Sequence, residues 1–194
     1  MFEILSHPNI PKPLHGLAPR VILGAGWWRK ERADAIDRQN SRCACCGVHL
    51  QDAEFHQWLE AHEFYNIDFV NGVATYSHAV ALCHACHQFI HSGRLLAVLR
   101  KGEISHERVY RIVDRGLDLC FENSVTPYIG LQPLVEHLDI NWTSFWEPDF
   151  YAPWANWKLI IDDLEYSGFK TIEDWADFYQ SEITDEERLK WSAW

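Results

Sequence analysis

The chain has 194 residues, 47% of them apolar, which fits one domain with an appendage better than two independent domains. No apolar run approaches the ~20 residues that span a bilayer, and the N-terminal residues lack the pattern of a signal peptide. We therefore expect a cytoplasmic protein with no membrane partner. The net charge of −11 is uneven, because residues 1–120 hold 13 Lys and Arg against 13 Asp and Glu, whereas residues 121–194 hold 4 against 15. Only the first part can offer a basic surface to nucleic acid.

The first 26 residues read as an N-terminal arm. Four prolines between Pro8 and Pro19 predict that residues 6–20 are extended or turning, without regular structure. A metal-binding domain with flanking helices is expected over residues 27–120. It opens with an amphipathic helix from Trp27 to Gln39, which delivers the chain to the first cysteine.

Two cysteine pairs share one spacing. Thiolates from two C-x-x-C turns complete tetrahedral zinc sites, and in a reducing compartment this spacing favours a metal over disulfides. The sequence therefore predicts a structural Zn²⁺ held by Cys43, Cys46, Cys83 and Cys86. The 36 residues between the pairs exceed the 15–20 of a simple ribbon, so we expect an inserted element with its own role. Cys45 and Cys120 are expected to be buried thiols.

The insertion reads as a hairpin followed by a helix. Residues 57–64 and 73–82 have strand patterns, and a helix is expected from His84 to about Arg100, with a weak point at its glycine. His87 and His91 lie one helical turn apart, so both imidazoles can reach one ion, and His62 on the first strand is placed to join them. A strand–strand–helix unit would then carry an ion where the hairpin meets the helix, a geometry that suits a metal-dependent nuclease.

Several ionisable residues neighbour these histidines in the sequence. Glu60 shares a strand face with His62, and we expect it either to accept a hydrogen bond from His62 or to bind the ion, the first being commoner. Glu63 points to the other face unless a bulge re-aims it. Loop or exposed helical positions suffice to explain His49, His56 and His84.

The remaining sequence completes an α+β fold class. A helix is predicted after an N-cap at Ser105, and the basic residues between Arg94 and Arg115 either contact phosphates or form a solvated face. Residues 121–194 are an acidic, Trp-rich C-terminal region, expected to be a mostly helical lobe. Its predicted helices are Trp154–Tyr166, Thr171–Gln180 and a capped start at Thr184–Glu187. An acidic, aromatic surface of this kind could bind a protein partner.

The run from Cys43 to His91 resembles the HNH endonuclease family. The resemblance covers roughly residues 40–95 and is carried by Cys43-x-x-Cys46-Gly47, by Glu60-x-His62, and by Leu82-Cys83-x-x-Cys86-His87-x-x-x-His91. It implies a small ββα-metal core, braced by a four-cysteine zinc site, that hydrolyses phosphodiester bonds of DNA with a divalent metal.

Position by position, the resemblance implies that His62 and His87 are metal ligands, and His91 matches the extra imidazole of three-histidine members such as the nuclease colicins. The family's general base falls on Glu63, and the asparagine that orients it falls on His78, so both positions are substituted. The catalytic residues expected from the resemblance are therefore Glu63, His78, His62 and His87. A carboxylate can accept a proton from water, although an unperturbed Glu (pKa ~4.3) is a weaker base than His (pKa ~6.5), and His78 could act instead.

Three functions are compatible with these residues. The first is a metal-dependent HNH-type endonuclease that acts on DNA, and the second is a catalytically inactive zinc-binding relative that binds nucleic acid or protein. The third is a purely structural zinc protein. For the histidine site, three imidazoles suit Zn²⁺, Ni²⁺ or Mn²⁺ better than Mg²⁺, although added oxygen ligands could shift that preference.

Overall fold

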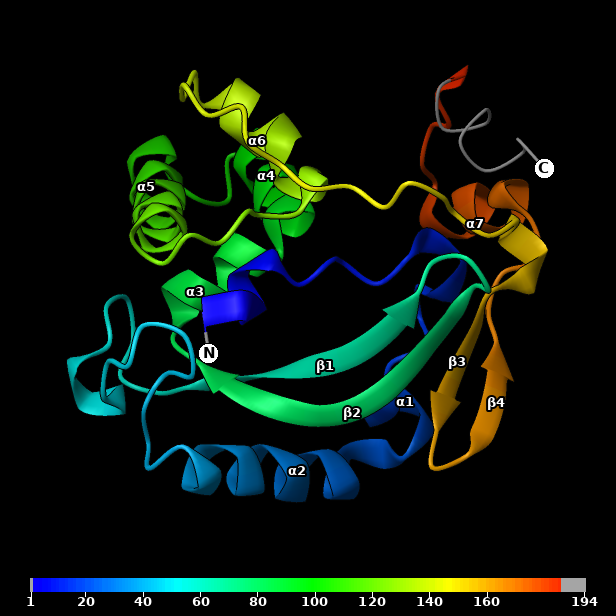
Figure 1. Cartoon of the computed structure of the whole chain (residues 1–194), viewed down its shortest axis with the longest axis horizontal. Helices are drawn as coiled ribbons and strands as arrows, with labels where there is room; N and C mark the ends of the chain where they lie inside the picture. The colour runs from blue at the N-terminus through cyan, green and yellow to red at the C-terminus, as the bar shows by residue number, and fades with distance from the viewer. Residues whose placement is uncertain (1, 186–194) are drawn as a thin grey trace. The chain divides into compact units, whose positions relative to one another are not determined.

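The computed structural model describes residues 2–185 and has a mixed α+β fold, which confirms the predicted fold class (Figure 1). Its α-helices are α1 (Pro19–Ile22), α2 (Gly24–Arg38), α3 (His84–Ile90), α4 (Ser92–Arg100), α5 (His106–Glu122), α6 (Gln132–His137) and α7 (Ile172–Tyr179). Its strands are β1 (Glu60–Asp68), β2 (Val73–Leu82), β3 (Lys158–Ile161) and β4 (Leu164–Ser167). Short 3₁₀ helices are η1 (Phe2–Ser6), η2 (Lys12–Leu14), η3 (Leu50–Asp52), η4 (Ile129–Leu131) and η5 (Trp154–Asn156). Within residues 2–185, no helix has both the length and the apolar character needed to cross a membrane.

The four strands form one sheet in the order β1-β2-β3-β4. β1 and β2 are the long, curved hairpin of Figure 1 and run in opposite directions. Their turn is closed by Asp68, whose Oδ1 accepts hydrogen bonds from the backbone amides of Val70 and Asn71, both at 3.0 Å, while Gly72 takes a φ of +70°. β2 pairs with β3 in parallel from Val73↔Lys158 onward, and β3 pairs with β4 antiparallel.

The chain forms two compact units, each assembled from three stretches of sequence. The first, which we call the helical unit, comprises the described parts of Met1–Asn9, Arg32–His62 and Ala79–Glu147. The second, the sheet unit, comprises the described parts of Ile10–Glu31, Glu63–His78 and Pro148–Trp194. The boundary crosses the hairpin, so one end of β1 and β2 belongs to the helical unit.

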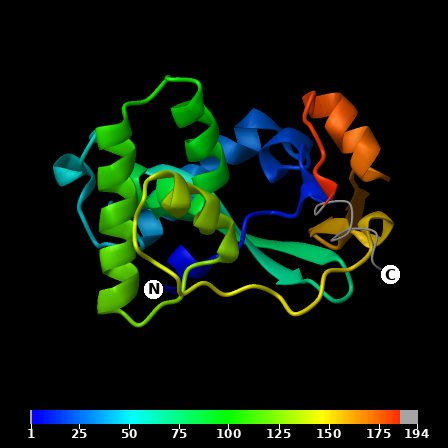
Figure 2. The same ribbon diagram turned by 90° about the horizontal axis from the view of Figure 1, so that it is seen from above.

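The helical unit is built around α3, the helix that follows β2 with only Cys83 between them. α3 packs against α4 and α5, and α4 packs against α6. Figure 2 shows α5 beside α4 and α6 from above. Ser105 caps α5 as predicted, since its hydroxyl accepts a hydrogen bond from the backbone amide of Arg108 at 3.3 Å. The buried face of α5 includes Val109, Ile112, Val113 and Leu117. These contacts fix the position of α3 within the unit.

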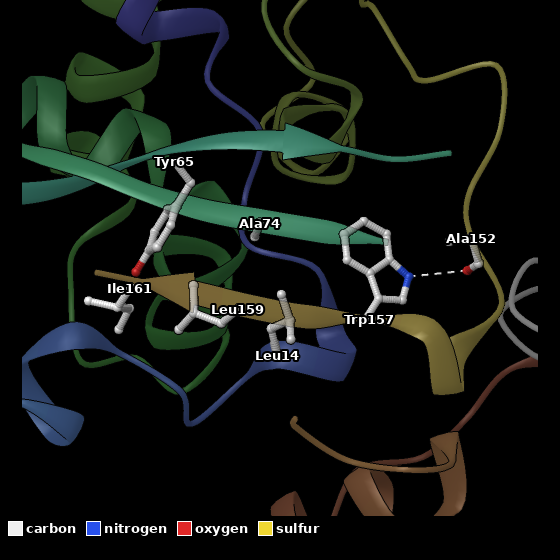
Figure 3. Packing of buried hydrophobic residues seen from close by; sticks show 7 residues of the cluster. All are labelled: Leu14, Tyr65, Ala74, Ala152, Trp157, Leu159 and Ile161. Atoms are coloured by element: carbon white, nitrogen blue, oxygen red, sulfur yellow. Dashed lines mark hydrogen bonds between the residues drawn. The ribbon is translucent and has the colours of Figure 1, made fainter. Parts of the chain in front are cut away.

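The sheet unit has its own core, drawn in Figure 3. The cluster consists of Leu14, Tyr65, Ala74, Ala152, Trp157, Leu159 and Ile161. The indole Nε1 of Trp157 donates a hydrogen bond to the carbonyl oxygen of Ala152 at 3.1 Å, so the only polar atom of this buried ring has a partner. This core holds β3 against the hairpin.

Two helix predictions need correction. The helix predicted over residues 84–100 is two helices, because the chain turns at His91 and Ser92 donates from its buried hydroxyl to the carbonyl oxygen of Gly130 at 3.0 Å. The helix predicted at Trp154–Tyr166 is wrong: η5 is followed by the β3–β4 hairpin. Asp162 and Asp163 both take positive φ values, 49° and 64°, which is the backbone of a tight two-residue hairpin turn.

Other boundaries shift in smaller ways. The first strand begins at Glu60 and runs to Asp68, where residues 57–64 were expected. The arm predicted to lack regular structure contains η2 and α1, and both carry a proline in their first turn, where its missing amide costs nothing. The helix predicted over Thr171–Gln180 is present as α7, and Thr171 is its N-cap, with the two reciprocal hydrogen bonds of a capping box. The predicted helical start at Thr184–Glu187 lies partly outside the described residues.

Candidate metal centres

The first cysteine pair sits on a tight turn. The backbone amide of Gly47 donates to the carbonyl oxygen of Cys43 at 3.0 Å, and the amide of Cys43 donates to the carbonyl oxygen of Val48 at 2.9 Å. Gly47 has a φ of +73°, a conformation that glycine adopts without strain. The amide of Ala44 donates to the carbonyl oxygen of Ala81 at 2.8 Å, which fastens the turn to the end of β2.

The second pair completes a four-cysteine group. Cys83 is the N-cap of α3, so Cys86 lies in the first helical turn. One sulfur from each of Cys43, Cys46, Cys83 and Cys86 lies within 4.8 Å of the others. The sulfurs of Cys46 and Cys83 are 3.7 Å apart. Zinc–sulfur bonds of 2.3 Å in a tetrahedron place sulfurs about 3.8 Å apart, so the group fits a tetrahedral metal ion.

The four thiols differ in pKa because they hydrogen-bond to one another. Hydrogen bonds from Cys46, Cys83 and Cys86 lower the pKa of Cys43 well below the ordinary thiol value. Hydrogen bonds with Cys43 raise the pKa of Cys83 and of Cys86 well above it. The remaining cysteines, Cys45 and Cys120, are free and buried, as predicted.

The second group consists of His62, His87 and His91, again with one ligand atom from each within 4.8 Å of the others. Their ring centroids are 5.6 Å (His62–His87), 4.9 Å (His62–His91) and 4.6 Å (His87–His91) apart. Nδ1 of His62 lies 3.2 Å from Nε2 of His91. Zinc–nitrogen bonds of 2.0–2.1 Å give a tetrahedral nitrogen–nitrogen separation of about 3.3 Å, so the three rings can share one metal ion. The predicted convergence of β1 and α3 is present.

Burial keeps His62 in the state that binds metals. The side chain is 4% exposed, and burial together with the nearby rings of His91, His87 and His7 lowers its pKa well below the usual value. A neutral imidazole offers a lone pair to a cation. His7 adds a fourth ring beside the group, edge-on to His62 with centroids 5.5 Å apart.

A third group, His56, Glu60 and His84, adjoins the second and was not predicted. One ligand atom from each of these residues also lies within 4.8 Å of the others. Glu60 Oε1 lies 2.7 Å from Nδ1 of His84 and 2.9 Å from Nε2 of His56, and its Oε2 contacts Nδ1 of His87. These separations are shorter than the ~3.3 Å between tetrahedral metal ligands and match charge-assisted hydrogen bonds of about 2.7–2.9 Å. The group therefore fits a hydrogen-bonded carboxylate better than an ion.

The electrostatics of Glu60 follow from these contacts. Burial would raise its pKa, but the hydrogen bond from His84 and the close contact with His87 outweigh burial and lower the pKa below the usual carboxyl range. The carboxylate was expected to bind the ion or to accept a hydrogen bond from His62. Its contacts in the structure are instead with His56, His84 and His87.

The two residues at the substituted family positions lie in the sheet unit. Glu63 follows His62 on β1, so its side chain leaves the strand on the opposite face. It is 8% exposed, and its Oε1 lies 3.7 Å from Nη1 of Arg20. His78 stacks on Phe64 with centroids 5.3 Å apart, and its Nδ1 lies 3.0 Å from the hydroxyl of Ser77. Neither belongs to the three described groups that could hold a metal.

His56 and His84 were expected to be ordinary loop or surface histidines. For His84, the sequence does contain a pattern that predicts a place beside the metal group. His84 and His87 are three residues apart at the start of a helix, so they lie on one face and can approach a single strand residue. His56 gave no such signal, because its place depends on the loop before β1. That loop also stacks Trp58 on His56, with centroids 3.6 Å apart and the rings nearly parallel.

Comparison with protein-family models, with curated proteins and with solved structures finds no match to this chain.

Proposed function

We propose that the chain is a metal-dependent endonuclease of the HNH type, which hydrolyses phosphodiester bonds of DNA. The proposal rests on one observation: His62, His87 and His91 come together where the hairpin meets α3, beside a four-cysteine group in the same unit. Cys43, Cys46, Cys83 and Cys86 would hold a structural zinc, and the histidines a second divalent ion. When bound, that second ion would polarise a phosphodiester and stabilise negative charge on it.

The chain's own residues would then position the metal ion and deprotonate the attacking water. His62 presents a buried, neutral ring, and His87 and His91 are held one helical turn apart by the hydrogen bond from the His91 amide to the His87 carbonyl at 3.1 Å. Glu63 and His78 occupy the positions of the family's base and of the asparagine that orients it, and the variants below test whether either activates water. A base of this kind contributes about 10²–10⁴-fold to the rate.

The proposal is tested by nicking of supercoiled plasmid DNA with Mg²⁺, Mn²⁺, Ni²⁺ or Zn²⁺. We expect His62→Ala and His87→Ala to abolish nicking, and His137→Ala, at an exposed ring on α6, to leave it unchanged. Glu63→Gln and His78→Ala assign the base, since loss of about 10²-fold or more is expected from only one of them. Absence of nicking with every metal would refute the nuclease.

A second candidate function is a non-cleaving module that binds nucleic acid or protein. It is favoured by the surroundings of Glu63, whose carboxylate is buried near Arg20 on the face of β1 opposite to His62. Gel-shift measurements on the same plasmid fragments distinguish the two functions. Binding without nicking supports the module, whereas binding with metal-dependent nicking supports the enzyme.

A further inference from the structure

The contacts of Glu60 place a hydrogen on each imidazole nitrogen that faces its carboxylate. The guanidinium of Arg108 lies with its Nη2 3.1 Å from Nε2 of His84, and a guanidinium can only donate. Nε2 of His84 is therefore the acceptor, and Nδ1 of His84 carries the hydrogen that faces Glu60 Oε1 at 2.7 Å.

The same reasoning applies to His56 and His87. Nδ1 of His56 lies 3.2 Å from the carbonyl oxygen of Trp58, and its Nε2 lies 2.9 Å from Glu60 Oε1, so both nitrogens face oxygen acceptors. A carboxylate only accepts, so each nitrogen that faces Glu60 bears a hydrogen. Nδ1 of His87 closely contacts Glu60 Oε2 without completing a hydrogen bond in the structure. A lone pair on Nδ1 would face a carboxylate oxygen, so the hydrogen belongs on Nδ1, and Nε2 keeps the lone pair that a metal needs.

We infer that Glu60 is the positioning residue of the three-histidine site, which holds His87 in the tautomer that binds metal through Nε2, while His56 and His84 hold the carboxylate in place. The inference rests on the proposed second metal ion. A carboxylate that holds the other nitrogen of a ligating histidine orients the ring and raises its basicity, and loss of such a partner costs 10–100-fold in metal affinity.

Arg108 extends this arrangement to α5. Its guanidinium lies 4.6 Å from the ring centre of Phe55, a residue of the loop that carries His56. The strand, the loop and α5 therefore all contribute to the place of one carboxylate. The Glu60 side chain is 22% exposed and has three imidazoles around it.

The experiment measures binding of Co²⁺ to the full-length protein whose cysteine site is loaded with zinc. Co²⁺ at imidazoles lacks the intense thiolate-to-cobalt absorption, so the histidine site is followed separately. We expect Glu60→Gln to weaken Co²⁺ binding 10–100-fold, with the zinc content unchanged. Glu60→Asp, which keeps the charge, should recover part of the loss. Glu54→Gln is the matched control, because Glu54 lies in the loop before β1 and pairs with the exposed Arg111.

A second measurement needs no variant. Nitrogen-15 NMR of the histidines in the zinc-saturated protein should show His87 bound through Nε2, with a hydrogen on Nδ1. Equal Co²⁺ affinity of wild type and Glu60→Gln, or metal bound through Nδ1 of His87, overturns the inference. Failure of wild type to bind Co²⁺ through histidine overturns it as well, together with the nuclease. Co²⁺ binding that depends on Glu60, without any nicking, overturns the nuclease alone.

Discussion

At the scale of single residues, His15 shows how the fold selects a neutral imidazole away from the metal groups. It lies in the sheet unit, where Nε2 faces the carbonyl oxygen of Ile10 at 3.2 Å and Nδ1 accepts a hydrogen bond from the indole Nε1 of Trp175 at 3.1 Å. The carbonyl needs a hydrogen on Nε2, and the indole needs a lone pair on Nδ1. Both requirements are met only by the neutral ring.

This arrangement predicts a pH dependence of stability. Burial lowers the pKa of His15 below 6.5, the positive charge of Lys12 lowers it further, and the hydrogen bond to Ile10 only partly opposes them. The unfolded chain therefore binds more protons than the folded chain as the pH falls below about 6.5. The free energy of unfolding should fall there, by at most about 1.4 kcal/mol per pH unit for this one proton.

Urea unfolding at several pH values between 5 and 8 checks this prediction. Metal release also depends on pH, so the quantity to compare is the difference between wild type and His15→Gln. We expect that difference to shrink as the pH falls. His137→Gln, at an exposed ring, is the control and should parallel wild type. A difference that stays constant from pH 8 to pH 5 would contradict the neutral ring.

At the scale of elements, the packing of α5 on α3 positions the metal groups. Gly116 of α5 faces the ring of Phe89 on α3, and a Cβ built at Gly116 would overlap that ring. α3 also carries Cys86 and His87, so a shift of α3 moves both metal groups. The missing side chain of one glycine is therefore part of the support for the site.

Two glycines separate helix propensity from packing. Replacement of glycine by alanine inside a helix ordinarily stabilises it by about 0.5–1 kcal/mol. Gly93→Ala should follow this rule, because nothing lies within 4 Å of the added Cβ. Gly116→Ala should instead destabilise the protein by about 1–3 kcal/mol, since Phe89 or α3 must move. Thermal unfolding of both variants measures whether each substitution stabilises or destabilises the protein. Stabilisation by Gly116→Ala would contradict the prediction, because it would show that α3 can move to accommodate the added methyl group without loss of stability.

Local sequence signals predicted the elements that they control. The predicted cap at Ser105 is present, because a hydroxyl next to an amphipathic run satisfies the free amides of the first turn. The hairpin and the convergence of His62 with His87 follow from strand and helix periodicity. The β3–β4 hairpin was missed because the aromatic residues around Trp157 fit a helical pattern, whereas Asp162-Asp163 marks a turn. The role of Glu60 depends on tertiary contacts with His56, His84 and Arg108, which periodicity does not encode.

At the scale of the whole molecule, the two units are interleaved. Each is assembled from three stretches of the chain, and the hairpin contributes to both. The four-cysteine group lies in the helical unit, whereas the cluster of Leu14, Trp157 and Leu159 lies in the sheet unit. Neither unit corresponds to a continuous segment of the chain. The segments of each unit are joined by segments that belong to the other unit, so we expect the two to fold together.

Loss of the structural zinc should therefore unfold both units in one transition. Cys83→Ser removes one of four thiolates, and metal binding at such a site contributes directly to the free energy of folding. We expect a loss of several kcal/mol, seen equally in hydrogen exchange of α5 amides and of β3–β4 amides. Elemental analysis should show zinc lost from this variant. Cys120→Ala, at a buried thiol outside the four-cysteine group, should retain zinc and cost only its packing, about 1 kcal/mol. Protection that vanishes from α5 but persists in β3–β4 would show that the sheet unit folds independently of the metal.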